Sequence, residues 1–512
     1  QTGFSTRREV LPPSERIIGD KTFSPDGQFI YFTAANKGER VNSLYRVPTL
    51  GGNQAKLVID VSSPVSFSPD GREMAFSRYD PKTMENSLVI ASSDGADERV
   101  LLAGTPGRNI VVYPAWSPDG ERIAFGEYSF PDGRERGGCV IRTITADGSR
   151  QKDLSAEKWD TCYRSGWLKD GKSLVFIGTK AGETWTTRRE QIYTISTVTG
   201  VSRRLTADGN RYHLGSLAVT NDDSIVAVPY NRSSQIWVMD PNGDTRSAVQ
   251  LTNGVADGRA GIAPMNDGRV AYLARTGENL TIWTMNPDGS DQKQLIRDPA
   301  FVEELRGSAD GRYFVFASPA EKASQLFRVD TTGENLVQLT SGDVSAVDST
   351  ISPDGKWVAY TGGITRDNQF FHPLFRVSTD GGEPVRLTER DCITPHYSPD
   401  GKFISCIINS EAEMMIVTSE GAFVRAYPLK TRPMVNIGCR FTPDGKNLVY
   451  IVMQKDISNL WLQPIDGGKP RQLTNFSHGQ IFNFAYSADG RRLFLARGPH
   501  QIQDAVLIRN FR

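Results

Sequence analysis

The stretch Ser24-Pro25-Asp26-Gly27 is written again and again along this chain, and it decides the fold. Four further identical copies begin at Ser68, Ser117, Ser352 and Ser398. Close or worn variants complete a set of eleven, whose aspartates stand at positions 26, 70, 119, 170, 222, 267, 310, 354, 400, 444 and 489. A period of 43 to 52 residues between these aspartates indicates a repeat architecture.

Each residue of the motif has a role in a tight turn. Proline fixes φ at the first corner, aspartate bonds neighbouring backbone groups, and glycine accepts the positive φ of a sharp reversal. A short apolar run follows most copies, such as residues 29–32 after the first copy and 174–176 after the fourth. These runs are too short for helices and are apolar on consecutive positions, which predicts strands covered on both faces.

Every repeat continues into a third strand, for example residues 191–195, and a fourth that often ends in Leu-Thr, as at Leu205-Thr206. Four antiparallel strands in about 45 residues form the blade of a β-propeller. We therefore predict an all-β fold of about eleven four-stranded blades. Propellers usually hold four to eight blades, so two lobes are favoured over one very large ring.

The expected lobes are residues 1–255 and 256–512, with an uncertain boundary at the worn fifth and sixth repeats. The last repeat has strands near 481–485, 493–495 and 505–508 but no fourth strand. We expect the N-terminal segment 5–11 to supply it, because pairing would cover an exposed edge.

Composition excludes several classes of protein. Lys+Arg 59 equals Asp+Glu 59, so nothing indicates a nucleic-acid partner. No apolar stretch is long enough for a membrane helix. Cys139 ends one repeat and Cys162 opens the next, which suits a disulfide between adjacent blades. The alternative is that all five cysteines are small buried residues in strands.

The Ser-Pro-Asp-Gly blades resemble the WD40-like PD40 repeats of the TolB family over essentially the whole chain. Residues 44–52, 63–71 and 472–508 also resemble the extracytoplasmic region of bacterial transmembrane serine/threonine kinases. In that family a kinase and a membrane helix precede the propeller, and both are missing from this sequence. The kinase resemblance implies a sensor ectodomain, and TolB implies a periplasmic protein-binding propeller.

Catalytic motifs are missing from the sequence. No G-x-G-x-x-G, H-R-D or D-F-G occurs, and neither does the G-x-S-x-G of prolyl-oligopeptidase-type hydrolases, which carry related propellers. No histidine pair has metal-ligand spacing. The axial channel is the remaining place for a ligand. Its candidate lining consists of Arg164, His213, Asp348, His396 and Arg440, for which simple solvated lining is the alternative.

We therefore expect a non-catalytic extracytoplasmic binding or sensor propeller, the ectodomain of a bacterial membrane kinase. The alternative is a free-standing secreted or periplasmic TolB-like interaction scaffold, and a third is an enzyme, either a peptidase fragment or a lyase that uses the channel. The expected partner is a protein or small molecule, with no nucleic acid, cofactor or metal. A membrane anchor upstream of Gln1 stays open.

Overall fold

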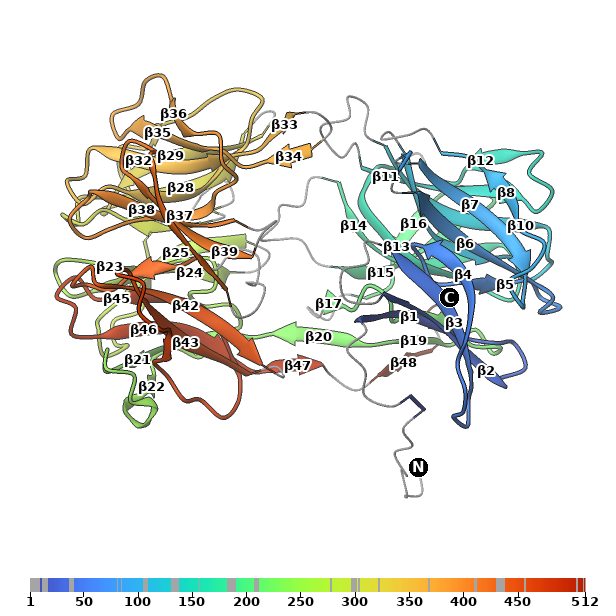
Figure 1. Cartoon of the computed structure of the whole chain (residues 1–512). Helices are drawn as coiled ribbons and strands as arrows, with labels where there is room; N and C mark the ends of the chain where they lie inside the picture. The colour runs from blue at the N-terminus through green and yellow to red at the C-terminus, as the bar shows by residue number, and fades with distance from the viewer. Residues whose placement is uncertain are drawn as a thin grey trace. The chain divides into compact units, whose positions relative to one another are not determined.

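The computed structural model of the chain consists of antiparallel sheets of short strands in two compact units (Figure 1). The first unit comprises Gln1–Glu183, Arg188–Tyr230 and Ile502–Arg512, and the second comprises Thr184–Thr187 and Asn231–Gln501. The predicted all-β fold is confirmed. The structure describes residues 10–11, 17–35, 41–80, 82–83, 85–104, 109–129, 138–155, 157–181, 190–206, 211–276, 279–295, 302, 304–320, 323–366, 369–408, 412–429, 438–454, 457–502, 505–509 and 511.

The first unit is built from the first repeats and the last strand of the chain. Its strands are β1 (Ile17–Phe23), β2 (Phe29–Ala35), β3 (Asn42–Pro48), β4 (Ala55–Val61), β5 (Ser66–Phe67), β6 (Glu73–Asp80), β7 (Glu85–Ser92), β8 (Arg99–Leu102), β9 (Asn109–Trp116), β10 (Arg122–Ser129), β11 (Cys139–Thr145), β12 (Gln151–Asp153), β13 (Trp159–Trp167), β14 (Ser173–Lys180), β15 (Gln191–Ser196), β16 (Ser202–Arg204), β17 (Arg211–Tyr212), β18 (Ala218–Val219), β19 (Ile225–Ala227), β20 (Pro229–Arg232) and β48 (Val506–Ile508). The chain passes between the units at β20 and again at β47 (His500–Ile502).

The second unit contains six four-stranded sheets in its described residues. Its elements are β21 (Gln235–Met239), η1 (Thr245–Ser247), β22 (Val249–Gln250), β23 (Ile262–Pro264), β24 (Val270–Thr276), β25 (Asn279–Met285), β26 (Lys293–Gln294), β27 (Arg306–Gly307), β28 (Tyr313–Pro319), β29 (Ser324–Asp330), β30 (Val337–Gln338), β31 (Ala346–Ile351), β32 (Trp357–Gly362), β33 (Ile364–Arg366), β34 (Gln369–Phe371), β35 (Leu374–Ser378), β36 (Val385–Thr388), β37 (Ile393–Tyr397), β38 (Phe403–Ile408), β39 (Glu413–Thr418), β40 (Phe423–Pro428), β41 (Arg440–Phe441), β42 (Asn447–Gln454), β43 (Ile457–Pro464), β44 (Arg471–Gln472), β45 (Gln480–Tyr486) and β46 (Leu493–Gly498).

The last repeat is completed differently from our expectation. Its strands β45 and β46 take β21 and β22 as their third and fourth strands, with Ile236 opposite Ala496 and Val238 opposite Phe494. The predicted N-terminal strand 5–11 lies mostly outside the described residues, and the edge it was expected to cover is occupied by β21. The expected boundary near residue 255 consequently falls inside the second unit, because residues 235–250 belong to its closing sheet.

The strand expected third in the last repeat closes the first unit instead. Residues of β48 pair with β19, with Ile508 opposite Ile225 and Leu507 opposite Val226. The apolar side chains of this pairing pack on a core around Leu217 and Ile192. Each unit is thus completed by a strand pairing between distant parts of the sequence.

The repeated turn has the predicted hydrogen bonds. In the first copy the Ser24 hydroxyl donates to Asp26 (2.5 Å), and Asp26 accepts the backbone N–H of Gln28 (3.0 Å). Gly27 has φ of +70°, the conformation that favours glycine. The hydrogen bond from Ser24, with help from the Gln28 N–H, lowers the pKa of Asp26 below its usual value. The aspartates of this turn therefore serve the turn.

The recurring Leu-Thr also has a structural role. Thr340 Oγ1 accepts the backbone N–H of Leu326 (2.9 Å) and donates to Gln325 (2.7 Å). Thr474 repeats the arrangement with Leu460 (2.9 Å) and Asn459 (2.9 Å). The threonine follows the short fourth strand, and its hydroxyl accepts a buried backbone N–H of the third strand that the fourth strand is too short to pair. This role explains why the residue type recurs.

Candidate functional site

The first strands of the six sheets in the second unit contact one another in sequence around a ring, from β23 through β27, β31, β37 and β41, with β45 contacting β23 and β43. Side chains two residues apart on a strand share a face. Arg306, His396 and Arg440 stand two residues before their turns, and Glu304 and Asp348 stand four residues before theirs. We call these five residues the central cluster.

Bulges in two first strands help to place the cluster. The register of β31 against β32 shifts between Val347 and Thr350, and that of β37 against β38 shifts between Ile393 and His396. A non-glycine residue adopts positive φ inside each bulge, Asp348 at 53° and Thr394 at 52°. Such residues carry strain, and bulges re-aim side chains, so this backbone is typical of functional positions.

The acidic half of the cluster is a pair of neighbouring carboxyl groups, Glu304 and Asp348. Asp348 Oδ2 accepts the backbone N–H of Thr394, 3.3 Å away, and Glu304 Oε2 accepts the N–H of Ser349 at the same distance. Burial, and then the proximity of Glu304, raise the pKa of Asp348 well above its usual value, although Arg306 acts in the opposite direction. This shift favours the protonated form of Asp348 and so reduces the negative charge of the pair.

In the basic half of the cluster, the guanidinium groups of Arg306 and Arg440 are hydrogen-bonded to carbonyl and amide oxygens and not to carboxylates. Arg306 donates to the carbonyls of Ser349 (2.9 Å) and Leu305 (3.0 Å). Arg440 donates to the carbonyl of Phe484 and to Asn483 Oδ1 (2.8 Å). Within the described part of the chain, neither guanidinium has a carboxylate oxygen within 4.0 Å. Burial, and then Arg306, lower the pKa of Arg440 well below its usual value.

His396 lies near these arginines and is only 8% exposed. Burial first, and then the charges of Arg440 and Arg306, lower its pKa well below the usual value, so the ring is neutral at pH 7. Among the described residues, its ring nitrogens have no hydrogen-bond partner. A neutral imidazole carries one N–H donor, which a ligand can therefore receive.

The centre of the first unit is arranged differently. Arg164, four residues before its turn, donates to the carbonyls of Lys21 (3.1 Å) and Gly215 (3.3 Å) and to Thr22 Oγ1 (3.2 Å). Burial lowers the pKa of Arg164, and the nearby Asp20 opposes that shift. Arg164 in β13 therefore connects to β1 and to the turn that precedes β18.

The predicted site residues separate into three places. Asp348, His396 and Arg440 come together in the central cluster, and Arg164 lies in the first unit. His213 is exposed in the turn between β17 and β18, where its ring meets Tyr230 edge-on with 6.3 Å between centroids. It stands seven residues before its turn, outside the register that places the other residues. Its predicted role in a channel lining stays a prediction.

Sequence reasoning missed Glu304, Arg306 and Asn483. A usable signal existed, because Arg306 has the same offset from Ser308 that His396 has from Ser398. Aligning the repeats on the turn and comparing the residues two and four positions earlier would have found the cluster.

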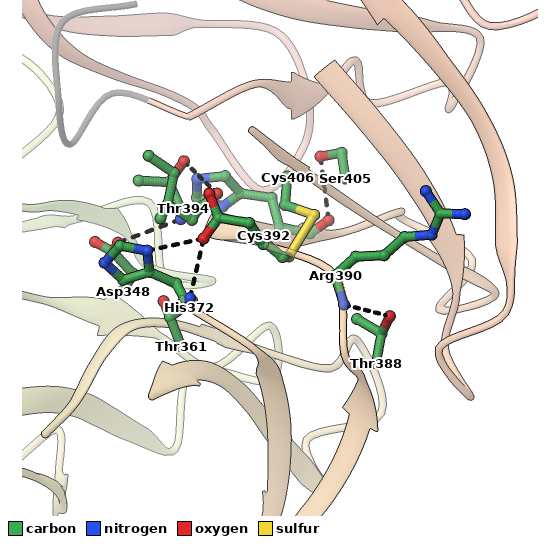
Figure 2. The surroundings of a disulfide bond; sticks show 12 residues. Asp348, Thr361, His372, Thr388, Arg390, Cys392, Thr394, Ser405 and Cys406 are labelled. Carbon is green, nitrogen blue, oxygen red and sulfur yellow. Dashed lines mark hydrogen bonds and ion pairs between the residues drawn. A yellow bond between two sulfur atoms is a disulfide. The ribbon is translucent and has the colours of Figure 1, made fainter. Parts of the chain in front are cut away.

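Two disulfides are present. Cys139 in β11 is bonded to Cys162 in β13, so the bond joins neighbouring repeats, with 5.9 Å between the Cα atoms. Cys392 is bonded to Cys406 (Figure 2), a pair that the sequence analysis did not single out. Cys439 is free and buried, and burial raises the pKa of its thiol to about 12.

The second disulfide adjoins the cluster. Thr394, which donates to Asp348, lies two residues after Cys392 (Figure 2). On the other side of Cys392, Asp391 Oδ1 accepts the backbone N–H of His372 and lies 2.9 Å from its Nδ1. In the described residues no group of His, Cys, Asp and Glu side chains is arranged to hold a metal ion, and no helix is long and apolar enough to span a membrane.

Comparison with protein-family models gives a match to the TolB beta propeller domain, PD40, over residues 60–305. The repeats in this range match the TolB-type β-propeller repeat. The solved structure of a putative TolB from Agrobacterium tumefaciens is similar, with 16% identity over 65% of this chain and 95% of that chain and a TM-score of 0.25.

Two curated relatives bear on catalysis. An uncharacterised peptidase, YuxL, from Bacillus subtilis is 23% identical over 51% of this chain and 31% of its own length. Dipeptidyl-peptidase 5 from Porphyromonas endodontalis is 23% identical over 46% of this chain and 35% of its own length. The chain thus spans about a third of the length of these relatives. We predicted that the chain is not an enzyme, and that prediction is contradicted, because these two relatives are peptidases.

Proposed function

We propose that this chain is the polypeptide-binding propeller of a peptidase-type protein, and that it binds polypeptide at the central cluster of the second unit. The observation that carries the proposal is that His396, whose ring has no hydrogen bond to a described residue, lies near Arg306 and Arg440, so that several hydrogen-bond donors face one place. The similarity to peptidases supplies the class of ligand.

A polypeptide suits this place for physical reasons. Its carbonyl and carboxylate oxygens accept hydrogen bonds from guanidinium and imidazole groups. The first strands already present bulged backbone around the cluster, and an extended peptide has unpaired N–H groups that such backbone could receive. The proposed location is an extracytoplasmic compartment, which the two disulfides support because such bonds persist in oxidising surroundings. The kinase-ectodomain role stays a prediction.

The experiment is a binding titration. A fluorescein-labelled, unstructured peptide of mixed sequence is titrated with the protein and followed by fluorescence anisotropy. Binding by the wild type, and its loss in the double variant Arg306→Gln/Arg440→Gln, would support the proposal. The matched control is Arg386→Gln, which removes the same charge from an exposed side chain on β36 of the same unit. No binding by the wild type, or equal binding by the double variant, would contradict it.

A further inference from the structure

The central cluster is unusual in how its charges are balanced. Two guanidinium groups are held by carbonyl and amide oxygens and have no carboxylate within ion-pairing distance among the described residues. Both arginines are partly buried, and a cation withdrawn from water normally acquires an anionic partner, because an uncompensated charge is expensive there. His396, 8% exposed, adds an imidazole donor with no partner in the described chain.

We propose that Arg306, His396 and Arg440 form a receptor for a carboxylate group of the bound polypeptide, an inference that rests on the proposed function. A guanidinium presents a planar fork of donors that matches the two oxygens of a carboxylate. A neutral imidazole can donate one further N–H to the same group.

The charge of the cluster favours a monoanion. The protonated form of Asp348 is favoured, so the acid pair does not fully offset the two guanidinium charges. A single carboxylate adds negative charge that the cluster lacks, whereas a doubly charged phosphate would add more than it lacks. The amino terminus of a peptide is a cation, and two arginines would repel it.

Carboxylate binding also changes the protonation of His396. In the free protein the charges of the arginines disfavour the imidazolium form of His396, and an adjacent carboxylate would counteract this repulsion. The groups that face the ring are Arg306 and Arg440, with the acid pair beyond Arg306. Binding therefore raises the pKa of His396, and the affinity for the carboxylate increases as the pH falls toward the pKa of the complex.

The carboxylate has two sources, the C-terminus of a peptide or an internal acidic side chain. Three peptides separate them: one with a free C-terminus and one glutamate, the same peptide with an amidated C-terminus, and the first peptide with the glutamate replaced by glutamine. Calorimetric titration of each into the wild type gives three affinities. We expect one of the two changes to weaken binding about tenfold or more, and that change identifies the source.

Variants test the residues. In His396→Gln and Arg440→Gln the sensitive peptide should bind about tenfold or more weakly and should lose its advantage over its neutral counterpart, whereas Arg386→Gln should behave as the wild type. The comparison among peptides uses the wild-type protein, so it stands even if a variant fails to fold. If all three peptides bind equally, the carboxylate receptor is overturned and polypeptide binding stands. If none binds, both the inference and the proposed function are overturned.

Discussion

In the first unit, the half-buried Arg164 donates hydrogen bonds to carbonyls and a hydroxyl of neighbouring repeats, whereas in the second unit Arg306 and Arg440 lie near His396, whose ring has no hydrogen-bond partner in the described chain. Both arrangements arise from the same register, in which residues two and four positions before the repeated turn lie at the centre. At the centre of the first unit, Arg164 connects neighbouring strands. At the centre of the second unit, the guanidinium groups of Arg306 and Arg440 lie near the same histidine.

On the proposed function, one repeat produces a structural centre in the first unit and a binding centre in the second. In the first unit, the residues two positions before the turn are small, as with Ala115 and Gly166. In the second unit, three repeats have a long polar side chain two positions before the turn, namely Arg306, His396 and Arg440. Several hydrogen-bond donors therefore lie near one another. A shared fold does not determine function, and these few positions account for the contrast.

The largest expected effect comes from replacing Arg164 with methionine. Arg164→Met leaves the carbonyls of Lys21 and Gly215 without their donor, so the free energy of unfolding of the first unit should fall by about 3 kcal/mol. Arg440→Met should reduce the stability of the second unit by about 1 kcal/mol or less, because it also removes an uncompensated buried charge. Hydrogen-exchange mass spectrometry measures both, strand by strand. Equal losses would remove the contrast between the centres.

The next effect concerns the closing sheet of the second unit. Arg497 in β46 is buried, donates to the carbonyl of His478 (2.6 Å), and its guanidinium lies 4.0 Å from the ring centroid of Phe476 and 5.1 Å from that of Trp237 in β21. Arg497→Ala should reduce the stability of this unit by about 2 kcal/mol and increase exchange in β21 and β46. Protection of the first unit should not change, and a fall in β19 or β48 would show that the closures are not independent.

A smaller effect is expected from pH. Because the pKa of His396 is lowered in the folded chain, the unfolded chain binds the proton more readily, and the second unit loses stability as the pH falls below the ordinary histidine value of about 6.5. His396→Gln should remove this part of the acid sensitivity. Urea unfolding between neutral and mildly acidic pH measures it. An unchanged pH slope in the variant would mean that the ring is already protonated or exposed.

The smallest effect concerns the acid pair. The raised pKa of Asp348 means that its contribution to stability is present at low pH and is lost as the pH rises through the folded pKa. Asp348→Asn imitates the protonated acid, so this variant should gain stability relative to the wild type as the pH rises, by about 1 kcal/mol or less. The same urea series measures this difference. A variant whose free energy of unfolding falls relative to the wild type as the pH rises would contradict the raised pKa of Asp348.

Much of the fold could be predicted from local chemistry. The turn around Asp26 and the threonine after the fourth strand both depend on residues close in sequence, so their spacing reveals them. The closures could not be predicted, because β21 and β46 are short strands far apart in the chain and many strand edges are equivalent in a pattern. Three members of the central cluster, Asp348, His396 and Arg440, were named from their residue types, and His213 was named for the same reason but lacks their register; their role in binding stays a prediction.

The most direct measurement is the titration of the His396 ring, followed by NMR of histidines labelled at Cε1, with His396→Gln to assign its signal among the five histidines. We predict that the ring of the free protein stays neutral below the ordinary histidine range and that a peptide with an accessible carboxylate raises its pKa, whereas the neutral counterpart does not. A ring that titrates near its ordinary value and ignores both peptides would contradict a positively charged carboxylate site at the centre of the second unit.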